Sequence, residues 1–311
     1  MTPPNEDQSA GKTALTFKDI RRLYDEGANI MGLFRERTGS TENSLEAILA
    51  SYDLQSGSYS KALENPEHFQ KLEAYATAFA AVLDALDGDS ILEVGVGEAT
   101  TLCNVVSRMK RAPREVLGFD LSWSRIAFAL RYASKFPAIR PRLFTGDLFS
   151  IPLPDSSVDI VYTAHSLEPN HGREKEAIEE LYRITRKWLV LCEPSYELGG
   201  EATQRHIEKH GYVRNLPGIA RELGYRITEH SLLDATWVPH NQTGLLVIAK
   251  DSAAPAPDET PLGCPNCKAA LRSARGNYFC ENCLQVFPVI DGIPCLLPAN
   301  GILATKYLEC P

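Results

Sequence analysis

Four cysteines near the end of the sequence have the spacing of a metal site. They form two C-x-x-C pairs, Cys264 with Cys267 and Cys280 with Cys283, and twelve residues separate the pairs. A hairpin of that length can return the second pair to the first, so that four thiolates surround one tetrahedral zinc ion. Two redox pairs or free thiols are the alternatives, but a redox C-x-x-C motif belongs at a strand-to-helix junction, which the local pattern lacks. Because four thiolates leave no open position for water, we expect this zinc to be structural and not catalytic.

A second group of residues has the pattern of a nucleotide-type binding site. The segment SILEVGVGEATTL places a strand, Glu93 and two glycines, Gly95 and Gly97, before a helix. Glycines at this position let a ligand approach the backbone at the carboxyl edge of an α/β sheet. The alternative is an ordinary tight turn between strand and helix, since Ala99 stands where the dinucleotide-binding pattern has its third glycine.

Two further acidic residues follow the next two predicted strands. Asp120 ends the strand in EVLGFD, where a carboxylate can accept hydrogen bonds from both hydroxyls of a ribose. Asp147 follows a third strand in TGDL, where it can accept from an adenine amine, while the N–H of Leu148 can donate to the neighbouring ring nitrogen. Each aspartate alone is also explained as a helix N-cap. Their order along the chain favours a cofactor site.

Taken together, these motifs resemble those of the class I S-adenosylmethionine-dependent methyltransferases. The resemblance spans about residues 86–250 and rests on EVGVGEAT, GFDLSWSRIAFA and GDLFSIPLPDSSVDIVYTAHSLEP. It implies an α/β fold with a Rossmann-like, seven-stranded methyltransferase sheet, and S-adenosylmethionine as the cofactor. The cofactor-binding residues that it implies are Glu93, Gly95, Gly97, Asp120, Leu121, Asp147, Leu148 and His165.

Two departures from that family pattern concern the turn before the fifth strand and the methyl acceptor. The chain has ITRKWLVL where many members have LKPGG, so a different turn is expected there. After the fourth strand it has AHSLEP in place of NPPY, a motif that marks enzymes acting on planar amide or base nitrogens. Its absence weakens adenine, the exocyclic nitrogen of guanine and glutamine as acceptors.

Three residues after the predicted fourth and fifth strands are our catalytic candidates. His165 and Glu168 follow the fourth strand and Tyr196 follows the fifth, next to the expected position of the methyl group. Alternatively, His165 packs beneath the cofactor and Glu168 caps the following helix. His206 and His210 share one helix face, but without a third ligand a solvated or substrate-facing helix is favoured over a metal site.

The apolar residues from Phe17 to about Leu86 recur at helical spacing, which predicts a helical lid over residues 16–86. Within it, SYDLQSGSYSKALENPEHF is similar to the lid segment of many small-molecule methyltransferases. An aromatic face there, from Tyr52 or Tyr59, would attract the sulfonium of the cofactor. Ordinary core packing of both tyrosines is the alternative.

The remaining domain boundaries follow from amino-acid composition and from the pattern of predicted strands and helices. Residues 1–15 are rich in turn formers and predict a flexible tail. Strand and helix patterns alternate over residues 87–250 and end in two strand-like runs too close for a crossover, so we expect the last strand to run antiparallel. Proline and alanine over 251–261 predict a linker, and 262–311 a zinc ribbon. The ribbon resembles the small activator subunit of methyltransferases of the translation machinery.

Composition bounds the function. The chain has 311 residues, 44% of them hydrophobic, and no apolar run long enough for a membrane helix or a signal peptide, so we expect a cytoplasmic protein without a membrane partner. A net charge of −8 disfavours nucleic acid, although Arg21, Arg22, Arg35 and Arg37 would supply a local basic surface. The favoured function is methylation of a small molecule, a saccharide or a biosynthetic intermediate. The alternatives are methylation of tRNA, rRNA or a translation protein, with the ribbon as activator or docking site for a protein partner, and a non-catalytic scaffold that binds the cofactor.

Overall fold

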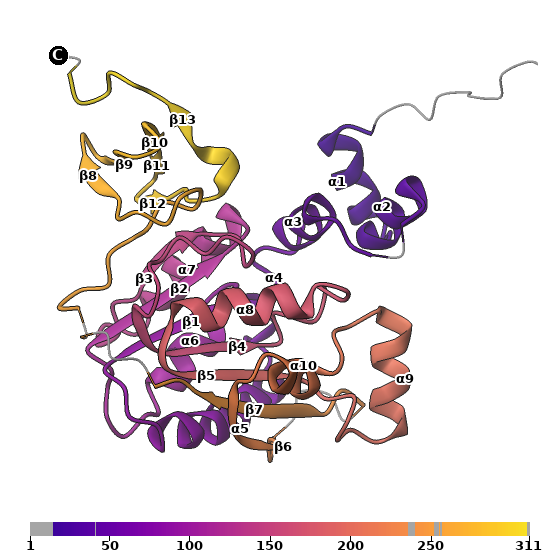
Figure 1. Ribbon diagram of the computed structural model, residues 1–311. Helices are drawn as coiled ribbons and strands as arrows, with labels where there is room; N and C mark the ends of the chain where they lie inside the picture. The colour runs from indigo at the N-terminus through magenta and orange to yellow at the C-terminus, as the bar shows by residue number, and fades with distance from the viewer. Residues whose placement is uncertain (1–14, 41, 236–239, 252–254, 256, 310–311) are drawn as a thin grey trace, which may run out of the picture.

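A computed structural model describes residues 15–40, 42–235, 240–251, 255 and 257–309 of the chain. The predicted tail, residues 1–15, therefore lies outside the described residues except for its last position, and part of the predicted linker does as well. Figure 1 shows a central sheet with helices on both faces, a group of N-terminal helices at one side and the C-terminal ribbon at the other. In the described part of the chain, no helix has the length and apolar character needed to cross a membrane.

The N-terminal part is helical, as predicted. Its helices are α1 (Phe17–Asp25), α2 (Ile30–Thr38), α3 (Leu45–Leu54), α4 (Ser58–Ala62) and α5 (Pro66–Asp84). Four of them begin at a side-chain cap, which is supplied by Thr16, Asn29, Ser44 and Asn65. Helices α1 to α3 share a small core of their own that contains Ile20, Ile30 and Ala50, whereas the buried side chains of α5 belong to the core of the sheet. The predicted lid thus consists of a cap formed by α1 to α4 and of helix α5, which covers the sheet.

The central sheet has seven strands in the order β3-β2-β1-β4-β5-β7-β6, which confirms the predicted fold class. The strands are β1 (Ser90–Val94), β2 (Glu115–Asp120), β3 (Arg142–Thr145), β4 (Val158–Ala164), β5 (Thr185–Pro194), β6 (Arg226–Leu232) and β7 (Thr243–Ala249). Strand β7 runs antiparallel to both of its neighbours, β5 and β6, as the closeness of the last two runs predicts. The order reverses direction at β1 and β4, where doubly wound sheets bind their ligands.

Helices cover both faces of this sheet and bury its apolar side chains. They are α6 (Thr100–Val106), α7 (Trp123–Ala133), α8 (Glu174–Ile184), α9 (Glu201–His210) and α10 (Leu216–Glu222). One face packs against α5, α6 and α7, and the other against α8 and α10. Helix α8 passes directly into β5, and the Thr185 hydroxyl at the junction donates to the Leu181 carbonyl at 2.7 Å. The unusual ITRKWLVL segment therefore replaces a turn with a capped helix end.

The C-terminal ribbon is built from short strands and is docked on the sheet. Its elements are β8 (Arg272–Ala274), β9 (Asn277–Cys280), β10 (Gln285–Phe287), β11 (Val289–Ile290), β12 (Ile293–Pro294), the 3-10 helix η1 (Pro298–Asn300) and β13 (Ile302–Leu303). Cys295 bridges to Thr145 at the end of β3 in parallel register, and the Thr145 hydroxyl accepts from the Leu296 N–H at 3.0 Å. The end of the predicted linker is also held, because the buried Thr260 hydroxyl donates to Glu115 at 2.6 Å.

Candidate active site

The turn after β1 contains Gly95 and Gly97, and a larger side chain at either position would fill the space beside the backbone. We call this turn the glycine cradle. Gly95 and Gly97 have φ values of 69° and 54°, in the left-handed region that favours glycine. A Cβ at Gly95 would lie 2.4 Å from the Cβ of Ser166, and one at Gly97 would lie 3.0 Å from Nη1 of Arg125. Because neither glycine has a side chain, only backbone atoms form the surface of this turn.

Asp120 links this cradle to the end of β2. Its carboxylate is buried and accepts from the Gly97 N–H and the Ser122 N–H, each at 2.9 Å. Burial raises the pKa of Asp120, and the nearby Arg125 guanidinium opposes that rise. A carboxylate fixed in this way presents its remaining lone pairs in a set direction, as recognition of neighbouring hydroxyls requires.

Glu93 is buried in β1 with only 2% of its surface exposed, and its carboxylate accepts from the Tyr162 hydroxyl at 2.8 Å. Burial raises the pKa of Glu93 to about 8, despite that hydrogen bond. A cationic group bound beside Glu93 would restore the ionised form.

The loop after β3 holds the second predicted aspartate beside the ribbon. Asp147 accepts from the Phe149 N–H at 3.0 Å, and burial raises its pKa. Three residues further on, the Ser150 hydroxyl donates to the Pro265 carbonyl of the ribbon at 2.5 Å. This loop therefore lies between the cofactor-site candidates and the ribbon.

These groups border a single cavity of about 630 Å³. The lining includes every predicted cofactor residue: Tyr59, Glu93, Gly95, Gly97, Asp120, Leu121, Asp147, Leu148 and His165. Residues of α2, α3 and α4 line the same cavity, so the N-terminal cap closes over the carboxyl ends of the strands. The chain thus brings these predicted residues together, while the part that each plays in binding stays a prediction.

Tyr52 and Tyr59, predicted to face a sulfonium, both contact a cation of the protein. The guanidinium of Arg125 lies 4.7 Å from the ring centroid of each tyrosine, and its Nε donates to the Tyr52 carbonyl at 3.1 Å. The side chain of Tyr59 is half exposed at the cavity rim. Its predicted contact with the cofactor remains a prediction.

The Glu98 carboxylate attaches the start of α4 to the cradle. This side chain, 2% exposed, accepts from three backbone N–H groups at the start of α4. The distances are 2.9 Å to Gly57, 3.1 Å to Tyr59 and 2.8 Å to Ser60. Since helix starts leave N–H groups without partners, a carboxylate there stabilises the start of α4.

At the opposite end of the cavity, His165 and Glu168 form a pair. His165, with a φ of 57°, hydrogen bonds Glu168 through Nδ1 and the Thr243 hydroxyl through Nε2 at 2.8 Å. Burial would lower the pKa of His165, but the Glu168 carboxylate raises it above the usual value. Tyr212 completes the group, because burial and the Glu168 carboxylate both raise its pKa. Both ring nitrogens of His165 are thus engaged, and the Glu168 carboxylate contacts both His165 and Tyr212.

Tyr196, the third predicted catalytic residue, is directed elsewhere. Its hydroxyl donates to Glu208 of α9 at 2.9 Å, and the Arg214 guanidinium lies 5.1 Å from its ring centroid. It is not among the described residues that line the cavity. The structure therefore separates Tyr196 from His165 and Glu168.

Several cavity residues have no motif that could have identified them from the sequence. Arg125 Nη2, Ser166 Oγ and Asn241 Oδ1 line the cavity as buried polar atoms without a hydrogen-bond partner among the described residues. Buried polar atoms usually have partners. Three residues that line the cavity thus carry a buried polar atom without such a partner.

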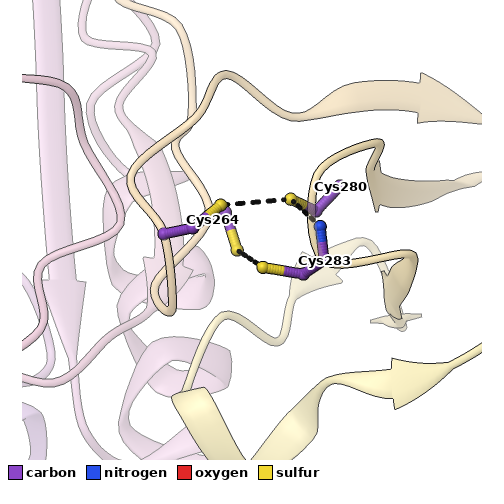
Figure 2. Close-up of side chains that lie close together, drawn as sticks. Cys264, Cys280 and Cys283 are labelled. Carbon is purple, nitrogen blue, oxygen red and sulfur yellow. Dashed lines mark hydrogen bonds between the residues drawn. The ribbon is translucent and has the colours of Figure 1, made fainter.

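The four predicted metal ligands meet in the ribbon. All four Sγ atoms lie within 4.8 Å of one another, and Figure 2 shows the sulfurs of Cys264, Cys280 and Cys283 facing a common point. The Sγ atoms of Cys264 and Cys283 lie 3.9 Å apart, and those of Cys267 and Cys280 lie 3.4 Å apart. A tetrahedron with Zn–S bonds of about 2.3 Å has edges of about 3.8 Å, so the donor set fits zinc.

Both cysteine turns of the ribbon have the same backbone shape. Lys268 after Cys267 and Leu284 after Cys283 adopt left-handed φ values of 64° and 53°. Lys268 also reaches the sheet domain, since its Nζ donates to Ser150 Oγ at 3.0 Å. The metal turn and the loop of Asp147 are thus joined by one side chain.

His206 and His210 do pack together on α9, and His240 joins them. The ring centroid of His206 lies 4.5 Å from that of His210 and 5.0 Å from that of His240. Over the described residues, however, the cysteine cluster alone brings three or more donor atoms as close as 4.8 Å.

The sequence was also compared with known proteins. Residues 91–187, from β1 to the start of β5, match the family model described as methyltransferase domain. An uncharacterized 37.1 kDa protein in transposon TN4556 of Streptomyces fradiae is 32% identical over 143 residues, 42% of this chain and 40% of the relative. A malonyl-[acyl-carrier protein] O-methyltransferase of Pectobacterium atrosepticum is 28% identical over 165 residues, 51% of this chain and 56% of the relative. The chain thus spans about half the length of these curated relatives.

Among solved structures, similar chains include one in a complex between the Haloferax volcanii Trm112 methyltransferase activator and the putative methyltransferase. It has 15% identity and a TM-score of 0.48, covering 63% of this chain and 96% of that one. Another is magnesium protoporphyrin IX methyltransferase from Synechocystis PCC 6803 with bound SAH, with 14% identity, a TM-score of 0.44, and coverage of 75% and 99%. Similarity at this level says nothing of the reaction.

Proposed function

We propose that the chain is an S-adenosylmethionine-dependent methyltransferase that acts on a small molecule. The observation that carries the proposal is the shared cavity. It joins a glycine cradle and two buried or half-buried aspartates, at one end, to the His165–Glu168 pair at the other. A methyltransferase domain match over the same strands supports this reading.

The residues present fit S-adenosylmethionine. Bound, it would supply an electrophilic methyl group on a sulfonium. Gly95 and Gly97 would let its methionine part approach the backbone, and Glu93 would accept from its amine. Asp120 would hold the ribose hydroxyls and Asp147 the adenine. The unpartnered Arg125 Nη2 and Ser166 Oγ are further polar contacts available to such a ligand.

For an acceptor that must lose a proton, Glu168 would be the base. His165 holds this carboxylate through Nδ1 while Thr243 engages its other nitrogen. The Glu168 carboxylate raises the pKa of His165, and the hydrogen bond from Nδ1 orients that carboxylate. His165 is therefore proposed as a positioning residue and Glu168 as the catalytic one.

A small acceptor is favoured because the cap covers the site. Side chains from α2, α3 and α4 line the cavity, which has the size of a small-ligand pocket. In this proposal the ribbon binds one structural zinc ion and braces the loop of Asp147 through Ser150 and Lys268. Docking of a protein partner on the ribbon remains a further proposal.

Calorimetry with S-adenosylhomocysteine tests the cofactor assignment. We expect binding by the full chain and a loss of about tenfold or more in affinity for Asp120→Ala, because a buried acceptor of two hydroxyls is removed. Asp25→Ala, an exposed position on α1, is the matched control and should bind normally. Absence of binding, or equal affinity of Asp120→Ala and the control, would refute the proposal.

A further inference from the structure

Arg35 on α2 presents a cation to the acceptor end of the cavity without a carboxylate to neutralise it. It lines the cavity and is partly buried. Its Nη1 donates to Asn43 Oδ1 at 2.5 Å, and no carboxylate oxygen of the described residues lies within 4.0 Å of its guanidinium. Since a guanidinium has five donors, most of its hydrogen-bonding capacity remains for a ligand.

The orientation of Arg35 is fixed from the catalytic loop. Asn43, which accepts from Arg35, donates through Nδ2 to the Pro169 carbonyl at 3.0 Å. Pro169 directly follows Glu168. The guanidinium is therefore tied to the same loop as the proposed base, and cap and loop place the two charges on one side of the cavity.

A second hollow of about 180 Å³ adjoins this position. Arg35, Asn43, Pro169 and His210 line both spaces, so the hollow opens from the acceptor end of the cavity. Lys209 adds another cation to its wall, and the pKa of His210 is lowered by burial, then by Lys209 and Arg35. Two cationic side chains, Arg35 and Lys209, thus border this hollow.

Two carboxylates also border this hollow. One of them, Glu208, is engaged by the Tyr196 hydroxyl at 2.9 Å. The other, Glu42, is exposed and forms no ion pair within 4.0 Å with Arg35. Neither carboxylate forms an ion pair with Arg35 within 4.0 Å.

We propose that the methyl acceptor is an organic anion, whose carboxylate or phosphate is bound by Arg35 in this hollow. Met31, Leu45 and Ile48 of the cap would contact its apolar body, since they line the cavity beside Arg35. This inference rests on the proposed function and adds the chemical class of the substrate. Paired N–H donors of arginine match the planar oxygens of such groups.

Binding of three probes to the S-adenosylhomocysteine-saturated protein tests this proposal. Benzoate, phenyl phosphate and benzamide share one ring and differ in charge. We expect the better anion to bind about tenfold more tightly than benzamide, by ligand-observed NMR titration. In Arg35→Met that preference should disappear, while Arg21→Met, an exposed arginine on α1, should keep it. The tighter of the two anions identifies carboxylate or phosphate as the group recognised.

Outcomes for the cofactor and for the anion are separable. If S-adenosylhomocysteine itself fails to bind, the proposed function is refuted. If S-adenosylhomocysteine binds equally to wild type and Arg35→Met, two results would refute only the anion subsite. One is that benzamide binds as tightly as both anions. The other is that neither anion binds at about 10 millimolar, which is about the weakest affinity worth claiming. An anion preference that survives Arg35→Met would also overturn it.

Discussion

Removing the Glu98 carboxylate should release α4 from the cofactor cradle. In Glu98→Ala, the N–H groups of Gly57, Tyr59 and Ser60 lose their acceptor at 2.8 to 3.1 Å. Hydrogen bonds to a charged group contribute about 1.5–3 kcal/mol each, but water can replace part of them once α4 opens. We therefore expect the local opening free energy of α4 to fall by about 3 kcal/mol, a change of about two orders of magnitude in opening.

Hydrogen exchange measured by mass spectrometry should detect this change. Peptides over 57–63 should exchange faster in Glu98→Ala, with an intermediate effect in Glu98→Gln, which keeps one acceptor oxygen. Affinity for S-adenosylhomocysteine should fall as well, because α4 and the preceding loop line the cavity. Glu64→Ala, an exposed carboxylate just after α4, is the matched control. Unchanged exchange over 57–63 in Glu98→Ala would refute the reasoning.

Three further predictions follow from charge and metal chemistry. With a pKa of about 8, Glu93 is about 0.9 protonated at pH 7, so a bound ligand amine that favours the ionised form should release nearly one proton from Glu93. Calorimetry in buffers of different ionisation enthalpy should detect this proton release, and Glu93→Gln should abolish the release. In Glu168→Gln, His165 loses the carboxylate that contributes most to raising its pKa, while burial and the smaller opposing effect of Glu193 remain. The pKa of His165 should therefore be lower than in the wild type in an NMR titration, and an unchanged pKa would contradict the pairing. Chelation of zinc, or Cys280→Ser, should lower the thermal midpoint, because buried Cys264 and Cys280 belong to the sheet's core; a midpoint that does not respond to chelator and recovers nothing with added zinc would contradict a structural metal.

The sheet and the positions of its cavity-lining residues were predictable because they depend on local order. Asp120 ends β2 and Asp147 follows β3, and parallel strands bring their carboxyl ends to one edge. The four cysteines were predictable for a similar reason, since spacing alone limits how two short turns can meet. Strand pattern and chain order thus contain this information.

Residues supplied by the cap and by later loops were not predictable. Arg35, Arg125 and Tyr212 reach the cavity through the packing of elements whose relative placement no local pattern specifies. Tyr196 shows the opposite case: it follows a strand at the correct edge, but α9 offers the Glu208 carboxylate and draws it away. Its position depends on a tertiary contact 12 residues away in sequence.

The docked ribbon also covers an edge of the central sheet. Strand β3 is the outermost strand of the sheet beyond β2, and an uncovered outer strand is a template for pairing with another chain. Cys295 occupies that edge by bridging to Thr145, while Leu262, Phe287 and Leu296 are buried in the sheet's core. The ribbon therefore covers part of the β3 edge. We expect a chain without the ribbon to expose that edge for pairing with another strand.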